Sequence, residues 1–190
     1  MADKRVGRRI LFLGPPGAGK GTQADMLART LGVPHISTGA MLRDAIAAGS
    51  DLGKQVEAVV ASGALVSDDL VLALVEERLG RDDAACGYLL DGYPRNLTQA
   101  NALAGSIGKG AIEVALLLEV DTEELVARLV KRAADEGRAD DTEEVIRHRL
   151  EVYESETLPL IEHYGEAVIR VNGLGAIDEI FARIALALAR

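Results

Sequence analysis

The chain has 190 residues, the length of one compact α/β domain with room for small insertions. Its 21 basic and 30 acidic residues give a net charge of −9, which disfavours nonspecific binding to nucleic acid or to an anionic membrane. The single cysteine, Cys86, excludes an intramolecular disulfide and a cysteine-cage zinc site, and no apolar stretch is long enough to span a bilayer.

Short apolar runs alternate with stretches of helical periodicity along the chain. Runs with little polar alternation predict parallel strands that are covered on both faces, at Ile10–Leu13, Pro34–Ile36, Tyr88–Asp91, Val114–Val120 and Val168–Val171. Asp121 with Glu124, and Asp141 with Glu144, have capping-box spacing and predict helix starts. An amphipathic helix over Ile177–Leu188 closes the chain. The pattern predicts a single three-layer α/β/α domain over residues 1–190, with a five-stranded parallel sheet.

A glycine-rich segment, Gly14–Thr22, follows the first apolar run and reads GPPGAGKGT. Backbone N–H groups of such a turn curl around an anion, and the N-terminus of the next helix points at it. Lys20 adds a charge that can reach the outer phosphates of a nucleoside triphosphate. Gly21 stands where most such loops place a magnesium-binding Ser or Thr, and Thr22 follows it. The segment predicts a triphosphate site, and the competing interpretation is a plain turn, which would need neither the lysine nor three glycines.

Two stretches fit the alternation of strands and helices less well. Residues 37–67 are rich in Ala and Gly and predict two or three short helices, whereas residues 131–141 are polar and charged. Both are interpreted as insertions on the side of the sheet where open α/β folds bind their ligands.

A second constellation, Asp91-Gly92-Tyr93-Pro94-Arg95, leaves the end of the third predicted strand. Gly92 permits an unusual turn and Pro94 stiffens the loop, so Arg95 is held at a strand end, where ligands bind. A free carboxylate at Asp91 would repel phosphates, and we therefore expect it to order magnesium through water. The alternative is an ordinary turn with a surface arginine.

These motifs and several others resemble, in order and spacing, the adenylate kinase family in its short-lid form. The further matching pieces are Ser37-Thr38-Gly39 with Arg43, Gly63-Ala64-Leu65-Val66, Gln99, and Gly137–Asp141 with Arg149. The resemblance covers essentially the whole chain. It implies a P-loop α/β fold with an AMP-binding insertion at residues 37–66 and a short lid at residues 131–141. It also implies reversible transfer of the ATP γ-phosphoryl group to AMP, giving two ADP, and a role in adenine nucleotide homeostasis.

The resemblance divides the site residues between two nucleotides. The ATP phosphates would be held by Gly17, Ala18, Gly19, Lys20, Gly21 and Thr22. Arg128 and Arg132 share one helix face and would meet ATP, Arg128 near adenine and Arg132 on phosphate, while the Gly175 backbone would contact adenine. The AMP site would comprise Thr38, Arg43, Ala64, Leu65, Val66, Gly92, Tyr93, Pro94, Arg95 and Gln99. Arg138 and Arg149 would bridge both nucleotides and complete a catalytic set with Lys20, Arg95 and Arg132.

The chemistry of this transfer explains why cations dominate the predicted site. Two unit charges ~4 Å apart repel by roughly 4 kcal/mol at an effective dielectric of 20, and several such pairs meet here. Arginine offsets the repulsion because its planar fork binds phosphate oxygens in pairs. No general base is expected, since the attacking AMP oxygen is already ionised at neutral pH. His35, His148 and His163 are therefore interpreted as packing or surface residues.

Two positions favour AMP over a pyrimidine acceptor. The Gln99 amide can donate and accept at once, as the adenine edge requires. Pyrimidine-directed relatives typically have Asn there and Ala in place of Thr38. The rival interpretations are a UMP/CMP kinase and a non-catalytic P-loop nucleotide-binding module. Two departures from the family pattern are Ala40, which replaces an Asp that makes a local hydrogen bond, and Ser67, a good N-cap for a helix over Asp68–Leu79.

The expected partners are ATP, AMP and ADP, with no nucleic acid and no membrane. Mg²⁺ should accompany ATP, held mainly by its phosphates and by water, and no protein residue is predicted as a metal ligand. No structural zinc is expected, because the lid lacks the length and the cysteines for one. Charged residues 1–9 lead directly into the first strand, so no secretory signal is visible and a cytoplasmic location is expected. A moving lid and AMP segment favour a monomer.

Overall fold

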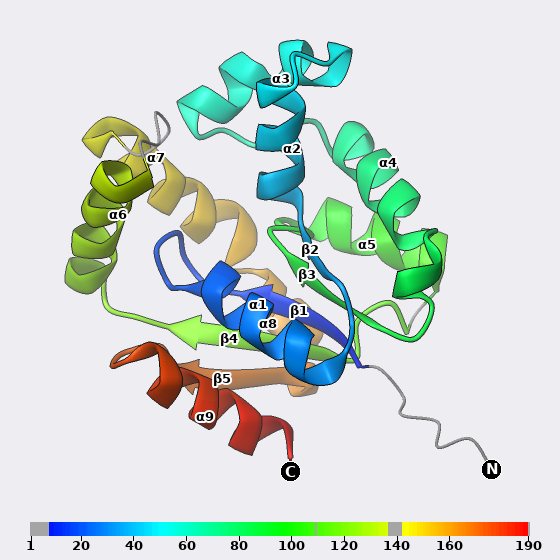
Figure 1. The fold of residues 1–190 in the computed structure, drawn as a ribbon, viewed down its shortest axis with the longest axis vertical. Helices are drawn as coiled ribbons and strands as arrows, with labels where there is room; N and C mark the ends of the chain where they lie inside the picture. The colour runs from blue at the N-terminus through cyan, green and yellow to red at the C-terminus, as the bar shows by residue number, and fades with distance from the viewer. Residues whose placement is uncertain (1–7, 109, 137–141, 190) are drawn as a thin grey trace.

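The computed structural model describes residues 8–108, 110–136 and 142–189 of the chain. At its centre is a five-stranded parallel sheet in the order β2-β3-β1-β4-β5 (Figure 1). The strands are β1 (Arg9–Leu13), β2 (His35–Ser37), β3 (Tyr88–Asp91), β4 (Val114–Glu119) and β5 (Val168–Asn172). All five predicted strands are confirmed, each with its ends within one residue of the expected position.

The central strand β1 shows why both faces of the sheet are covered. Successive side chains of a strand point to opposite faces. Ile10 and Phe12 lie in one buried cluster, with α1 (Lys20–Leu31) and α9 (Ile177–Leu188). Leu11 and Leu13 lie in the other, with α4 (Asp68–Leu79), α5 (Leu97–Ile107) and α8 (Leu160–Tyr164). The molecule is therefore the predicted three-layer α/β/α structure of P-loop type.

Two further groups of helices project from the sheet. The predicted insertion at residues 37–66 contains α2 (Thr38–Ala47) and α3 (Asp51–Ser62), and α6 (Thr122–Glu136) and α7 (Glu143–Val152) form the other group (Figure 1). Short helical turns cover Asp82–Ala84, Tyr153–Thr157 and Gly165–Ala167. Within the described ranges, no helix combines the length and the apolar character needed to cross a membrane.

The helix starts only partly follow the predicted caps. Asp121 accepts from the backbone N–H of Glu124 at 2.9 Å and starts α6 as expected. Helix α7 is capped instead by Thr142, whose Oγ1 accepts from Val145 at 3.4 Å; the expected cap, Asp141, lies outside the described residues. Ser67 occupies the N-cap position of α4, as predicted, but its side chain makes no capping hydrogen bond.

Candidate active site

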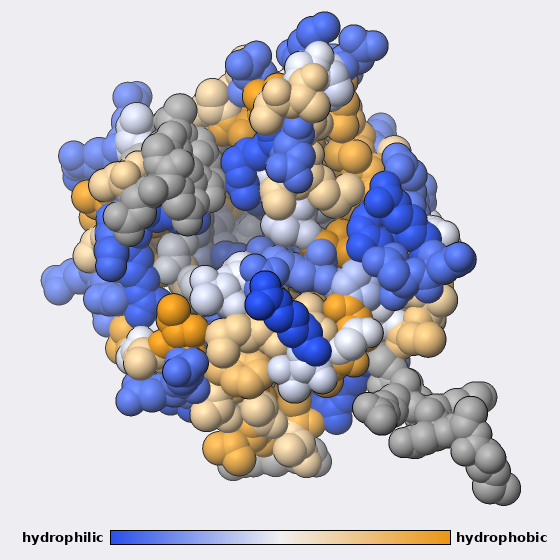
Figure 2. Space-filling model, in the orientation of Figure 1, coloured by the Kyte–Doolittle hydropathy of each residue, from blue (hydrophilic) through white to orange (hydrophobic). Residues whose placement is uncertain are grey.

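A cleft of about 1130 Å³ opens at the carboxyl ends of the strands. Figure 2 shows the hollow on this face, with hydrophilic side chains around its rim. The predicted site residues that line it are Gly17, Gly19, Lys20, Gly21, Thr22, Arg43, Leu65, Gly92, Pro94, Arg95, Arg128, Arg132 and Arg149. A smaller cavity of about 60 Å³ shares several of these and adds Thr38, Ala64, Val66 and Gln99. The structure thus gathers both predicted halves of the site.

A few predicted residues are not placed in either cavity. Ala18, Tyr93 and Gly175 line neither, although Ala18 belongs to the loop and Tyr93 to the turn that do. Tyr93 is buried, and its hydroxyl donates to the backbone carbonyl of Gln99 at 3.3 Å. Arg138 lies outside the described residues, as do all of residues 137–141 of the predicted lid, whereas residues 131–136 continue helix α6. Nucleotide contacts of these residues stay predictions.

The glycine-rich loop has the backbone that an anion cradle needs. Gly14, Gly17 and Gly19 all have positive φ angles, of 139°, 84° and 87°. A Cβ at Gly17 would also lie 2.9 Å from Cγ of Leu129, so both conformation and space demand glycine there. The loop ends where α1 begins, and the first turn of α1 has no acidic residue. The positive end of the helix dipole therefore faces the cleft, and no carboxylate in the first turn of the helix itself neutralises it.

Lys20 is held inside this loop. Its Nζ donates to the carbonyl oxygens of Gly14 and Pro15 at 2.8 and 2.9 Å. Burial lowers the pKa of Lys20 to about 8; the carboxylate of Asp91 opposes this shift, and the charges of Arg95, Arg149 and Arg132 add to it. The three arginines come from the β3 loop, α7 and α6. Their influence on one lysine indicates that cations from separate elements converge at the loop, as a site for two polyphosphates requires.

Arg95 is anchored through its backbone and its side chain. Its Nε donates to the carbonyl of Gly92 at 2.9 Å, and its own carbonyl accepts from Oγ1 of Thr157 at 2.8 Å. Gly92 has a positive φ of 83° and also accepts from Oγ1 of Thr38 at 2.9 Å. Burial lowers the pKa of Arg95 and Asp91 opposes the shift, but a guanidinium stays charged in any case. A fixed cation therefore lies where the two cavities meet.

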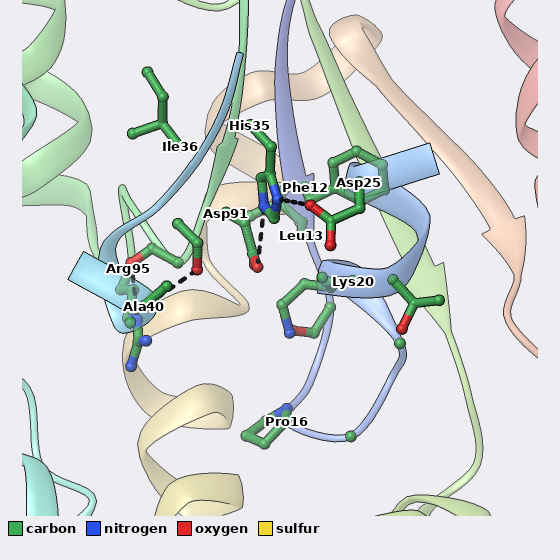
Figure 3. A pocket seen from close by; sticks show the side chains of 18 of the residues that line it. Phe12, Leu13, Pro16, Lys20, Asp25, His35, Ile36, Ala40, Asp91 and Arg95 are labelled. Atoms are coloured by element: carbon green, nitrogen blue, oxygen red, sulfur yellow. Dashed lines mark hydrogen bonds and ion pairs between the residues drawn. The ribbon is translucent and has the colours of Figure 1, made fainter. Parts of the chain in front are cut away.

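His35 lines the cleft, which the sequence interpretation as a packing or surface residue missed. Figure 3 shows it between Asp25 and Asp91, with its Nδ1 2.6 Å from Oδ1 of Asp25 and its Nε2 3.6 Å from Oδ2 of Asp91. Burial acts to lower the pKa of His35, but the hydrogen bond to Asp25 and the nearby charge of Asp91 outweigh it and raise the pKa above its ordinary value. The sequence signal for a place in the cleft was its position in the short predicted strand Pro34–Ile36, because ligands of open α/β folds bind at the carboxyl ends of the strands.

The fold places two partners beside Asp91 that the sequence did not reveal. Burial would raise its pKa, but the contact with His35 and the charge of Lys20 leave the pKa below its ordinary value. The carboxylate also faces the start of α1, because a Cβ at Gly21 would lie 3.8 Å from its Oδ2. Asp91 is therefore an ionised oxygen donor beside the phosphate loop, with its charge balanced by the protein itself.

A hydrogen bond from Arg128 connects α6 to the segment that follows β5. Nε of Arg128 donates to Oε1 of Glu124 at 2.7 Å, and its Nη2 donates to the carbonyl of Gly173 at 3.0 Å. The guanidinium plane is thus fixed at the edge of the cleft. Among the residues that the structure describes, no group of three or more His, Cys, Asp or Glu side chains is arranged to hold a metal ion.

Comparison with known proteins agrees with this geometry. The family model for adenylate kinase matches residues 12–169. An adenylate kinase of Stenotrophomonas maltophilia (strain R551-3) is 51% identical over 184 residues, covering 95% of this chain and 98% of its own. The adenylate kinases of Xanthomonas euvesicatoria pv. vesicatoria (strain 85-10) and Xylella fastidiosa (strain M23) are 50% and 48% identical, covering 96% and 95% of this chain and 100% and 98% of their own. The match spans the glycine-rich loop, the Asp91–Arg95 turn and the arginines of α6 and α7, and the chain belongs to the adenylate kinase family.

Proposed function

We propose that the cleft binds ATP and AMP side by side and transfers the γ-phosphoryl group of ATP reversibly to AMP, giving two ADP. The convergence of three arginines on the partly buried Lys20 in one cleft carries this proposal, because one nucleotide would not need so many cations from separate elements. Membership in the adenylate kinase family supports the same reaction. The proposed role is adenine nucleotide homeostasis.

The donor half is assigned to the glycine-rich loop and α6. Backbone N–H groups of residues 17–22 would hold the ATP phosphates at the N-terminus of α1. Lys20 would leave the carbonyls of Gly14 and Pro15 to reach the outer phosphates. Arg132 would bind phosphate, and Arg128, anchored to Gly173, would lie against adenine, with the Gly175 backbone close by.

The acceptor half is assigned to the smaller cavity and the adjoining part of the cleft. Arg43, which lies in α2, and Arg95, which lies in the loop after β3, would both bind the AMP phosphate. The base would enter among Thr38, Gln99 and residues 64–66, which line the small cavity. Arg149 lines both cavities and would contact both nucleotides, as would Arg138.

Catalysis by these residues would rest on alignment and charge stabilisation. The attacking oxygen of AMP is already ionised, so the neighbouring His35 need not act as a base. Arg95, Arg132 and Arg149 would stabilise the charge that spreads over the transferred group. The ionised Asp91 beside the loop suits a magnesium ion that keeps its water shell, and bound magnesium would neutralise charge on the phosphate oxygens.

Residues 131–141 would close over the phosphates as a lid. Closure excludes water, which would otherwise accept the phosphoryl group and hydrolyse ATP. We propose that the enzyme acts as a monomer, because both the lid and the AMP segment must move, and that it acts in the cytoplasm on the cell's adenine nucleotides.

The test is an acceptor screen combined with a bisubstrate ligand. With ATP as donor, AMP should be phosphorylated much faster than UMP, CMP or GMP, and ADP should be the only adenine product. Diadenosine pentaphosphate should bind far more tightly than ATP, since it would occupy both halves at once. Equal binding of the two ligands, with no ADP formed, would identify a P-loop binding module instead, and a preference for UMP or CMP would identify a pyrimidine kinase.

A further inference from the structure

The side-chain amide of Gln99 is held by one partner on each of its two ends. Its Oε1 accepts from the backbone N–H of Arg95 at 2.7 Å, and its Nε2 donates to Oδ1 of Asp68 at 2.7 Å. Gln99 is only 2% exposed, so water cannot readily replace either partner. A buried amide with both ends engaged has little freedom to rotate.

The chemistry of the two partners fixes which end of the amide points where. An N–H group can only donate and a carboxylate can only accept. Turning the amide by half a rotation would set its NH₂ against the N–H of Arg95 and its carbonyl against the Asp68 carboxylate. Both contacts would become repulsive, so the two partners select the same orientation independently.

Asp68 is itself held in place for this contact. It is the first residue of α4, and the same Oδ1 also accepts from Nδ2 of Asn96 at 3.3 Å. Asn96 in turn caps α5 by accepting from the backbone N–H of Gln99 at 2.8 Å. The carboxylate therefore joins the start of α4 to the start of α5.

We propose that Asp68 is a positioning residue for base selection, because it holds the Gln99 amide in the orientation that accepts adenine and rejects hypoxanthine. The inference rests on the proposed function, in which Gln99 reads the acceptor base. No motif of the sequence marks Asp68 for this task, since it contacts the base only through Gln99.

The two bases differ in the edge that a fixed amide can match. Adenine presents an acceptor at N1 and a donor at its 6-amino group, whereas hypoxanthine presents a donor at N1 and an acceptor at O6. An amide carries two donor hydrogens and two acceptor positions, so Gln99 keeps one of each after binding Asp68 and Arg95. In the held orientation these complement adenine. In the reversed orientation they would complement hypoxanthine equally well.

The experiment compares AMP with IMP as acceptors, with ATP as donor. In Asp68→Ala the amide loses its hydrogen bond to a charged partner, and kcat/KM for AMP should fall about tenfold while the IMP-to-AMP ratio of kcat/KM rises about tenfold. The KM for ATP should stay unchanged. Asp68→Asn should behave as the parent enzyme, because its Oδ1 can still accept from Gln99. Asp69→Ala is the matched control, since Asp69 is exposed in the same first turn of α4.

A fall in activity with AMP and IMP alike, with their ratio unchanged, would show a merely structural role and overturn the inference. Gln99→Ala separates this failure from failure of the proposed function. If Gln99→Ala changes the IMP-to-AMP ratio and Asp68→Ala does not, only the role of Asp68 is wrong. If Gln99→Ala leaves the ratio unchanged, Gln99 does not read the base and the inference is wrong, whereas continued ADP formation from ATP and AMP would still support the proposed function.

A second pair of variants decides the question if Asp68→Ala fails to fold. Gln99→Glu places two carboxylates against each other, and adding Asp68→Asn restores a donor to face Glu at position 99. The double variant should melt at a higher temperature than Gln99→Glu alone. Its IMP-to-AMP ratio of kcat/KM should exceed that of the parent enzyme, because a carboxylate accepts from the N1–H of hypoxanthine and no longer donates to N1 of adenine. Absence of both effects would overturn the proposed contact.

Discussion

Nζ of Lys20 donates to the carbonyl oxygen of Gly14, 2.8 Å away at the other end of the same loop. Together with the bond to Pro15, this contact keeps the ammonium group inside the loop that would hold the ATP phosphates. The lysine needs to exchange only two carbonyl partners for phosphate oxygens when ATP binds. Its cation is therefore preorganised, which is the condition under which electrostatic stabilisation of a transition state is large.

Replacing this lysine should remove much of the activity. Lys20→Met should lower turnover by on the order of 10²–10³, the effect of losing one preorganised donor. A coupled assay of ADP formation from ATP and AMP would measure it. Lys54→Met is the control, because the Lys54 side chain is 71% exposed on α3. Near-full activity of Lys20→Met would contradict the assigned role.

The low pKa of Lys20 predicts a pH dependence in the alkaline range. The ammonium form binds phosphate, and burial lowers its pKa to about 8 in the free protein, so the cation is complete below that pH and is lost as the pH rises through it. We expect kcat/KM for ATP to fall above about pH 8. The corresponding alkaline decrease in kcat should lie at higher pH, because bound phosphates favour the charged form of Lys20.

A lysine-specific origin of that decrease can be checked directly. The guanidinium of Lys20→Arg stays charged throughout the range, so its residual activity should show no such fall. An identical alkaline decrease in this variant would assign the titration to another group.

The close packing of α3 on α2 predicts a sensitive glycine in the AMP segment. A Cβ at Gly53 would overlap the carbonyl oxygen of Ala45, so neither backbone can accommodate it without moving. Gly53→Ala should lower the free energy of unfolding by about 1–3 kcal/mol and raise the KM for AMP more than that for ATP. Thermal melts and initial rates would measure the two effects.

Gly105→Ala provides the opposite expectation in the same experiment. This glycine lies inside α5 with no atom within 4 Å of the added Cβ, so alanine should stabilise the protein by about 0.4–1 kcal/mol. Equal effects of the two substitutions would show that the α2–α3 contact is not tight.

If the lid must open before ADP leaves, turnover should depend on the viscosity of the solvent. We expect kcat at saturating ATP and AMP to fall as sucrose or glycerol is added, because lid opening and product release, and not phosphoryl transfer, limit the rate. A polymer that raises macroscopic viscosity alone serves as control. A kcat that is insensitive to small viscogens would place the limiting step in the chemistry.

Features with a local signal could be predicted from the sequence. The strands, the glycine-rich loop and the Asp91–Arg95 turn each depend on neighbouring residues, and the structure places them as expected. The lid boundary is less clear, because the periodicity of α6 continues to Glu136 and so runs through the first half of the predicted segment. Thr142 caps α7 although Asp141 offered a similar oxygen one residue earlier.

Contacts between distant residues could not be predicted. His35 pairs with Asp91 across two neighbouring strands, and Gln99 with Asp68 across 31 positions, and neither pair has a recurring spacing. The same limit applies to Asp91. In the sequence it is a lone carboxylate among phosphate-binding residues, whereas the fold supplies Lys20 and His35 to balance it.

The order of the strands has a consequence for how donor and acceptor meet. The loop after β1 and the turn after β3 leave adjacent strands, which are paired from Arg9 with Tyr88 to Phe12 with Asp91. The backbone hydrogen bonds between β1 and β3 therefore hold the start of the loop and the start of the turn about 4.8 Å apart, which is the spacing of neighbouring strands. Closure of the proposed lid would then have to supply charge and exclude water, but it would not have to bring the loop after β1 and the turn after β3 together.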